Sequence, residues 1–137
     1  MLGYEDTSAL IALYLPSDKY HRAAAAAYLQ ESTSTGRRFV IGRPVLAESI
    51  DGLTKRVSKR EAIEQLQFTE ASAVMRVERD TEEDHARARE LFLRYDDQSV
   101  DMTDALSFSL MERFRIREAF TFDDDFVVHG FTRMPEV

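Results

Sequence analysis

Residues 1–16 have the sequence MLGYEDTSALIALYLP, which joins a short strand-like segment to an apolar helical segment through one aspartate. Residues 1–5 fit a strand, and the apolar series at residues 9–14 fits a helix that Pro16 ends, because proline lacks the amide of a continuing helix. Asp6 therefore stands at a strand-to-helix turn. In open parallel sheets this turn lies at the carboxyl edge, where ligands bind.

The same alternation of strand and helix continues to the last block of the sequence. Further strands are expected at residues 37–41, 73–77 and 119–122, with a short edge strand at 131–134. Helices are expected from a cap at Ser17 or Asp18 to Glu31, from Pro44 to Val57, from Ser58 to Thr69, from Asp80 with Glu83 to about Asp96, and from Thr103 to about Arg115. This order predicts a three-layer α/β/α sandwich with a central, mainly parallel sheet, formed by residues 1–137 as a single domain.

Length and composition agree with one compact domain. The chain has 137 residues, of which 44% are hydrophobic and 31% charged, so it can bury a core. It contains no cysteine, which excludes a disulfide framework and a thiolate metal site. No basic leader or long apolar run stands out, so we expect a soluble, cytoplasmic protein without a membrane partner.

Four acidic residues occupy comparable places along the alternating pattern, each where a strand ends or a helix begins. They are Asp6, Glu48, Asp104 and Asp123. Because the carboxyl ends of parallel strands share one edge, we expect these side chains to gather in space. Gathered carboxylates raise one another's pKa unless a cation lies among them. The pattern predicts a site for a hard divalent metal ion.

The overall charge points away from nucleic acid. The net charge is −7 and the pI is near 5.0, whereas phosphate binding usually depends on a basic surface. A bound cation would nevertheless reverse the field of the four carboxylates. A local basic cluster consists of Lys55, Arg56, Lys59 and Arg60. The sequence leaves open whether it faces the acids, and a solvated helix junction is the favoured interpretation.

Several blocks of the sequence resemble the signature blocks of the PIN domain family. They are DTSALIA at residues 6–12, PVLAE at 44–48, TDALS at 103–107 and AFTFDDDF at 119–126, followed by Gly130 and Phe131. The order, the spacing and the near full-length coverage make this resemblance far more specific than one motif. At this chain length, the sequence resembles the VapC-type toxin ribonucleases of toxin–antitoxin pairs.

The resemblance implies Mg²⁺- or Mn²⁺-dependent hydrolysis of RNA phosphodiester bonds. It implies catalytic and metal-binding roles for Asp6, Glu48, Asp104 and Asp123. It also implies that Thr7, Ser8 and Thr103 support the metal or the substrate. The partners that it implies are an RNA substrate, a cognate antitoxin protein and a second copy of the chain in a homodimer.

Each acid also has a simpler structural explanation. Asp6 and Asp104 are common helix-cap residues, Asp123 is a common turn residue, and Glu48 fits a solvated helix face. Their joint occurrence in the four blocks favours the shared site. Helix capping and a role beside the metal remain about equally good explanations for the hydroxyls next to Asp6.

Several acids depart from the pattern of the family. Glu5 stands where an apolar strand residue is usual, and its side chain either joins the metal site or, as we favour, escapes through an edge position. Asp101 stands where a serine is frequent and is interpreted as a solvated loop acid rather than an indirect metal ligand. Asp124 and Asp125 stand where many relatives carry basic residues, and whether they join the site is left open.

Two other functions remain open at this point. A receiver-like or phosphatase domain also uses Mg²⁺ and clustered aspartates, but this chain lacks the paired aspartates after the first strand and the late lysine of that class. A catalytically weak PIN fold that acts as a binding module would fit the low basic content and the unusual Glu5 and Asp101.

Overall fold

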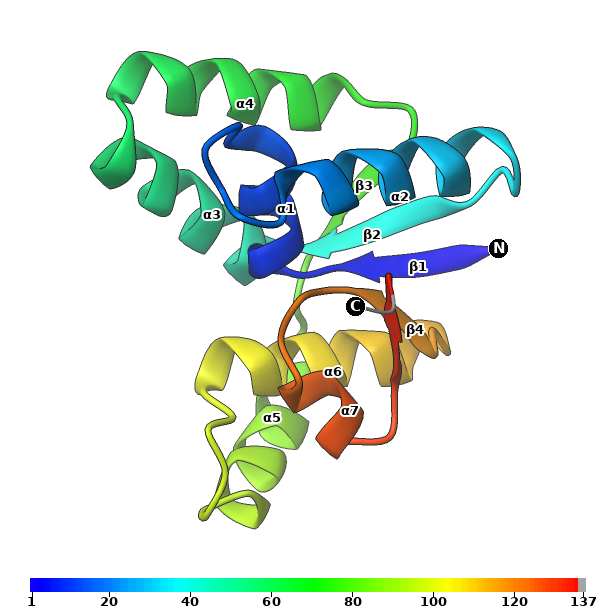
Figure 1. The fold of residues 1–137 in the computed structure, drawn as a ribbon. Coiled ribbons are helices and arrows are strands. Elements are labelled where there is room, and N and C mark those ends of the chain that lie inside the picture. Colours follow the sequence, from blue (N-terminus) through cyan, green and yellow to red (C-terminus); the bar gives the residue numbers. More distant parts are fainter. Residues whose placement is uncertain (136–137) are drawn as a thin grey trace.

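The computed structural model describes residues 1–135 and contains one five-stranded sheet with helices on both faces (Figure 1). The strands are β1 (Leu2–Glu5), β2 (Arg38–Gly42), β3 (Met75–Glu78), β4 (Glu118–Phe120) and β5 (Thr132–Met134). Their order is β3-β2-β1-β4-β5, and every neighbouring pair is parallel. The predicted α/β fold with a central parallel sheet is confirmed.

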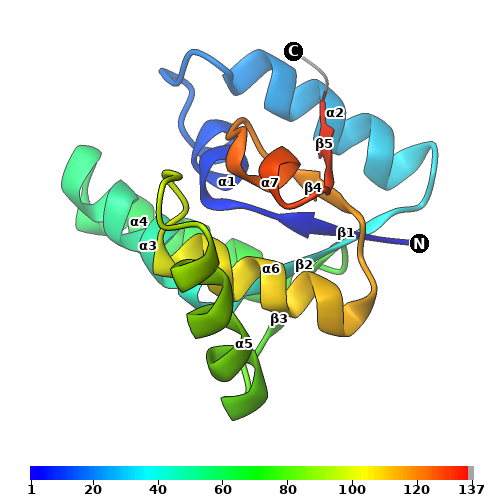
Figure 2. The ribbon, with the colours of Figure 1, turned by 90° about the horizontal axis from the view of Figure 1, so that it is seen from below.

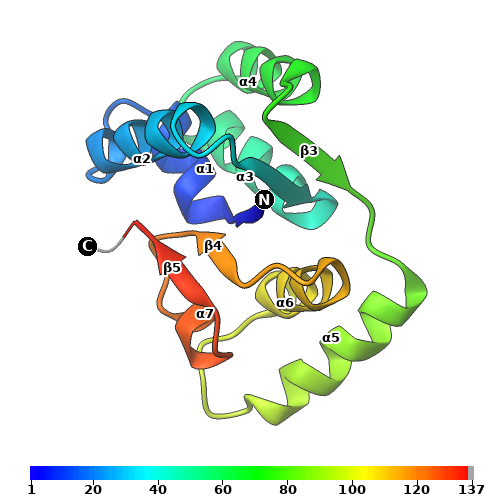
Figure 3. The same cartoon turned by 90° about the vertical axis from the view of Figure 1, so that its right-hand side faces the viewer.

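The helices form the two outer layers. They are α1 (Thr7–Tyr14), α2 (His21–Thr33), α3 (Arg43–Arg56), α4 (Lys59–Ala71), α5 (Glu82–Arg94), α6 (Met102–Phe114) and α7 (Asp125–Val128). Figure 3 shows α1, α2 and α4 on one side of the sheet, and seen from below α5, α6 and α7 lie in front of it (Figure 2). Within residues 1–135, none of these helices combines the length and apolarity needed to cross a bilayer.

The strand order reverses at β1, which is the central strand. The chain first builds outward through β2 and β3, then returns to place β4 and β5 on the other side of β1. Glu5 of β1 pairs with Phe120 of β4, and the Asp6 amide continues the ladder by donating to the Phe120 carbonyl at 3.0 Å. Ligand sites in such sheets lie at this reversal.

β2 approaches β1 and α6 closely at Gly42, just before α3 begins. The buried Tyr4 hydroxyl donates to Ser107 Oγ at 2.8 Å, which ties β1 to α6. A Cβ on Gly42 would lie 2.6 Å from the Tyr4 hydroxyl oxygen and 2.6 Å from Leu110 Cδ1. Only glycine fits there without displacing either side chain, and α3 follows immediately with Arg43.

Two predicted helix starts are wrong. The helix expected from Ser17 or Asp18 begins at His21, because Asp18 Oδ1 accepts the Tyr20 amide at 2.8 Å and forms a separate turn. The capping pattern expected at Asp80 and Glu83 lies one residue later, where Thr81 and Asp84 each accept the other's backbone amide. The cap at Ser58 is confirmed, since its hydroxyl accepts the Glu61 amide at 3.0 Å.

Glu5 does not escape through an edge, and that prediction is wrong because β2 and β4 flank β1 on both sides. Its side chain is 0% exposed, and neither carboxylate oxygen has a hydrogen-bond partner within residues 1–135. Side chains alternate along a strand, so Glu5 points away from the face that Tyr4 shares with α6. Burial first, and the charge of Asp6 second, raise the pKa of Glu5 well above its usual range.

The variant Glu5→Gln is expected to become more stable than the wild type as the pH rises. A carboxyl whose folded-state pKa is raised contributes stability below its unfolded pKa and loses it at higher pH, because only the unfolded chain ionises freely. Chemical denaturation between pH 4.5 and 7 measures the difference, which should grow by up to about 1.4 kcal/mol per pH unit. A difference that stays constant over this range would contradict the prediction.

Candidate metal centre

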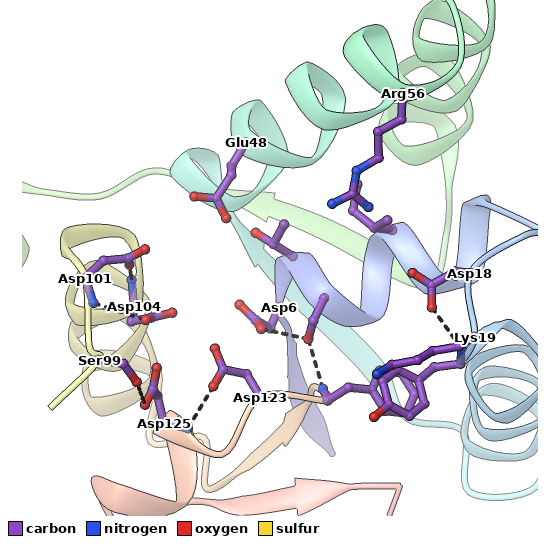
Figure 4. Close-up of a pocket in the computed structure, with 15 residues that line it drawn as sticks. Asp6, Asp18, Lys19, Glu48, Arg56, Ser99, Asp101, Asp104, Asp123 and Asp125 are labelled. Atoms are coloured by element: carbon purple, nitrogen blue, oxygen red, sulfur yellow. Dashed lines mark hydrogen bonds between the residues drawn. The ribbon is translucent and has the colours of Figure 1, made fainter.

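An acidic pocket of about 540 Å³ lies at the carboxyl ends of β1 and β4 (Figure 4). Seven carboxylates line it, from Asp6, Asp18, Glu48, Asp101, Asp104, Asp123 and Asp125. All four predicted acids are therefore brought to one place, although more than 115 positions separate the first from the last, Asp6 and Asp123. Parallel pairing of the strands accounts for this convergence.

Thr121 and Ser8 hold Asp6 through one oxygen of its carboxylate. Thr121 Oγ1 donates to Asp6 Oδ2 at 2.8 Å, and Ser8 Oγ donates to the same oxygen at 3.1 Å. Asp6 is the N-cap residue of α1 but makes no side-chain cap hydrogen bond. Its carboxylate is thus used in the pocket, and the capping explanation does not account for it.

Asp104 is oriented by a capping box. The Asp101 side chain accepts the Asp104 amide at 2.8 Å, and Asp104 Oδ2 accepts the Asp101 amide at 3.2 Å. Asp101 is thus the N-cap of α6 rather than a plain solvated loop acid, which corrects that interpretation. Because the cap uses one oxygen of Asp104, it fixes the direction of this carboxylate and leaves the other oxygen to the pocket.

Asp123 and Asp125 lie together in the turn after β4. The Asp123 amide donates to Thr121 Oγ1 at 3.0 Å, and Asp123 Oδ1 accepts the Asp125 amide at 3.0 Å. Ser99 Oγ donates to Asp125 Oδ1 at 2.7 Å. Carboxylate oxygens of Asp104, Asp123 and Asp125 all lie within 4.8 Å of one another, so one cation can reach all three.

The remaining predicted residues occupy different positions around the pocket. Glu48 projects into it from α3 and is exposed (Figure 4). Thr7 also lines it, and its hydroxyl oxygen is buried without a hydrogen-bond partner among residues 1–135. Thr103 is half-buried and is not among the lining residues. Asp124 is exposed outside the pocket and pairs with Arg133.

Three acids of the pocket, Asp6, Asp104 and Asp123, have raised pKa values. Burial is the largest cause for Asp6 and raises its pKa to about 6, although hydrogen bonds from Thr121, the Thr7 amide and Ser8 oppose the shift. Burial, followed by the charges of Asp101, Asp6 and Asp123, raises the pKa of Asp104. Burial raises the pKa of Asp123 as well.

The donor set fits a hard divalent cation. It consists of carboxylate oxygens, which Mg²⁺ and Mn²⁺ prefer to softer ligands. The acids whose oxygens converge belong to separate segments, and hydrogen bonds within the protein orient them. The unpartnered Thr7 hydroxyl offers one more oxygen at the wall.

Sequence reasoning missed three residues of this site. Asp125 was left open as a ligand, yet its oxygen lies with those of Asp104 and Asp123. Its signal was the spacing of two residues after Asp123, which permits a turn in which both carboxylates face one side. Thr121 and Ser99 had no distinguishing signal, because hydroxyl residues are common in strands and loops.

Comparison with known proteins finds relatives of this chain. A model of the PIN domain family matches residues 4–131. The 23S rRNA-specific endonuclease VapC20 of Mycobacterium tuberculosis is 33% identical over 90 residues, which are 66% of this chain and 68% of the relative.

Two solved structures share the fold. The crystal structure of M. tuberculosis VapC20, described as a Sarcin-Ricin loop cleaving toxin, matches with a TM-score of 0.86 and 28% identity, over 96% of this chain and 97% of that one. VapBC2 from Rickettsia felis, bound to a promoter DNA fragment, matches with a TM-score of 0.72 and 14% identity over 97% of each chain. The second likeness shows the fold alone.

Divalent metal is expected to stabilise the protein more strongly at pH 8 than at pH 5. Raised carboxyl pKa values make the metal-free fold less stable as the pH rises, and the ion binds only the ionised acids. Mn²⁺ at roughly 100 times its Kd should add about 2.7 kcal/mol at pH 8. Thermal melting with and without Mn²⁺ measures this.

The variant Asp104→Asn distinguishes the effect of carboxylate repulsion on the melting temperature from the effect of metal binding. It keeps an oxygen for the capping box but removes one charge, so the metal-free variant should melt above the wild type at pH 8 and gain less from Mn²⁺. If Asp104→Asn lowered the metal-free melting temperature and kept the full Mn²⁺ effect, the assignment of this pocket as the metal site would be untenable.

Proposed function

The chain belongs to the PIN domain family, and on that premise we propose that it is a metal-dependent endoribonuclease and the toxin of a toxin–antitoxin pair. The observation that carries the proposal is the convergence of Asp104, Asp123 and Asp125 within 4.8 Å, beside the buried Asp6. These acids come from the β1–α1 turn, the first turn of α6 and the turn after β4, yet they face one pocket.

We infer that Asp6, Glu48, Asp104 and Asp123 are the catalytic metal-binding residues and that Asp125 joins them. Mg²⁺ or Mn²⁺ bound there would lower the pKa of a coordinated water and stabilise the charge that develops on the leaving oxygen. The carboxylates would hold this ion at the scissile phosphate. Without the ion, their negative charges would repel that phosphate.

The neighbouring hydroxyls have supporting roles in this proposal. Ser8 and Thr121 keep Asp6 pointed into the pocket, since both donate to its Oδ2. The unpartnered Thr7 hydroxyl is available to donate to a phosphate oxygen or to a bound water. Thr103 does not line the pocket, so its contribution is limited to the first turn of α6.

The substrate and partners follow from the relatives. VapC20 is described as specific for 23S rRNA, and we propose 23S rRNA, reached in the cytoplasm, as the substrate here. A nuclease of that kind arrests its own host, so we also propose a cognate antitoxin that silences it. Homodimerisation remains a proposal from the resemblance.

The other functions have less support. A receiver-like or phosphatase domain is not favoured, because the PIN family model covers residues 4–131. A catalytically weak binding module would not need three carboxylates that converge in one pocket, where burial raises the pKa of Asp104. Direct assay of cleavage distinguishes a nuclease from such a module.

The wild-type chain, freed of antitoxin, is expected to cleave purified ribosomes or 23S rRNA with Mg²⁺ or Mn²⁺ and to be inactive in EDTA. Asp6→Asn and Asp123→Asn should each lower kcat at least about 100-fold, because a bound cation supplies several kcal/mol of transition-state stabilisation. Primer extension locates the cleavage, and growth arrest on expression gives an independent readout.

The matched control is Asp124→Asn. It removes the same charge one residue from Asp123, but the Asp124 side chain is 85% exposed and lies outside the pocket, so activity should remain at the wild-type level. Cleavage that survives EDTA, or that is lost equally in all three variants, would exclude the proposed site.

A further inference from the structure

The acidic pocket also carries two basic side chains, on the side where Asp18 lies. Figure 4 shows Lys19 and Arg56 across the pocket from Asp101, Asp104 and Asp125. Among the pocket-lining residues of the described chain, these two are the basic ones. They come from separate segments, because Lys19 lies between α1 and α2 whereas Arg56 is the last residue of α3.

An aromatic stack holds Lys19 in place. Its Nζ lies over the Tyr20 ring, 4.9 Å from the centroid, and the Tyr20 ring stacks on Phe122 with centroids 4.4 Å apart and planes 1° apart. The Phe122 amide donates to Ser8 Oγ at 2.9 Å, and Asp123 is the next residue. The ammonium group is therefore supported by the same turn that carries a metal-site carboxylate.

Arg56 points into the pocket without a competing ion pair. Its side chain is exposed, and no carboxylate among residues 1–135 forms a salt bridge with it. Its sequence neighbours Lys55, Lys59 and Arg60 do not line the pocket, and Arg60 pairs with Glu64 at 3.7 Å. The predicted solvated helix junction thus describes those three residues but not Arg56.

We propose that Lys19 and Arg56 bind backbone phosphates of the RNA nucleotides that flank the scissile bond, and that the Tyr20–Phe122 stack positions Lys19 for this contact. The inference rests on the proposed ribonuclease function and names the residues that hold its substrate. In a protein of net charge −7, the metal ion can neutralise only the phosphate that it touches, so flanking phosphates need separate cations.

Each residue also has a purely structural explanation. Arg56 lies in the last turn of α3, where a positive charge offsets the helix dipole, and Lys19 gains from its contact with Tyr20. These roles would affect folding and not RNA affinity. Salt dependence separates the two explanations, because a phosphate contact releases a counterion.

The test compares Lys19→Gln and Arg56→Gln with the matched control Lys55→Gln on the same helix. Cleavage of 23S rRNA is measured from 50 to 300 mM KCl. Each pocket variant should raise KM about fivefold at 0.1 M salt and make the slope of log(kcat/KM) against log[salt] shallower by about 0.7, the single-strand value for one lost contact. Because the contact is present before and during reaction, kcat should remain unchanged.

Two further measurements isolate the phosphate contact. A labelled RNA oligonucleotide that spans the mapped cleavage site is bound to the inactive Asp123→Asn protein, and adding Arg56→Gln or Lys19→Gln should weaken binding about fivefold at 0.1 M salt. Arg56→Lys should restore most of the affinity. The Mn²⁺-induced rise in melting temperature should match the wild type in both pocket variants, since neither side chain is a metal ligand.

The variant Tyr20→Leu tests the support of Lys19. It should raise KM to the level of Lys19→Gln, and the double variant Tyr20→Leu/Lys19→Gln should add little, because both changes remove one contact. Melting curves first establish that Tyr20→Leu is folded. Full additivity of the two KM effects would mean that the stack does not position Lys19.

The outcomes distinguish this inference from the proposed function. If wild type cleaves RNA while Lys19→Gln and Arg56→Gln keep its KM and salt slope, the phosphate contacts are refuted and the nuclease stands. If Lys55→Gln shows the same loss as the pocket variants, the effect is one of overall charge and the inference fails. If wild type cleaves no RNA under any metal condition, both fail.

Discussion

The structure depends on the parallel pairing of β1 with β4. These strands are separated by more than a hundred residues in the chain, yet Glu5 lies beside Phe120 and the Asp6 amide extends the ladder by one bond. This register places Asp6 next to Thr121, whose hydroxyl donates to it at 2.8 Å. The same Thr121 hydroxyl accepts the Asp123 amide at 3.0 Å, so the adjacency also places the turn that carries Asp123.

The cost of this arrangement is electrostatic. Burial and mutual repulsion raise the carboxyl pKa values of Asp6, Asp104 and Asp123, so the chain gives up stability to keep them together. Hydrogen bonds from Thr121 and Ser8, and the capping box of α6, hold them in place. Buried Glu5, without a partner among residues 1–135, adds a further cost on the opposite side of the strand.

Net charge proves a poor guide to the partner of this protein. Its value of −7 includes the seven carboxylates concentrated in one pocket, where a bound divalent cation would offset part of the negative charge. Lys19 and Arg56 also line the pocket, and Lys19 lies over the ring of Tyr20, which stacks on Phe122. The local arrangement of charge, rather than its sum, determines which polyanion can approach.

Sequence patterns were sufficient for the α/β alternation, the parallel sheet and the positions of Asp6, Glu48, Asp104 and Asp123, because strand periodicity, caps and turn residues are local signals. Tertiary structure decided the rest. Glu5 is buried because β1 is central, Asp125 joins Asp104 because of the turn after β4, and Arg56 alone among four neighbouring basic residues turns into the pocket. Each of these features depends on the order of the strands in the sheet and on contacts between side chains that are distant in sequence. Local sequence patterns do not encode such contacts.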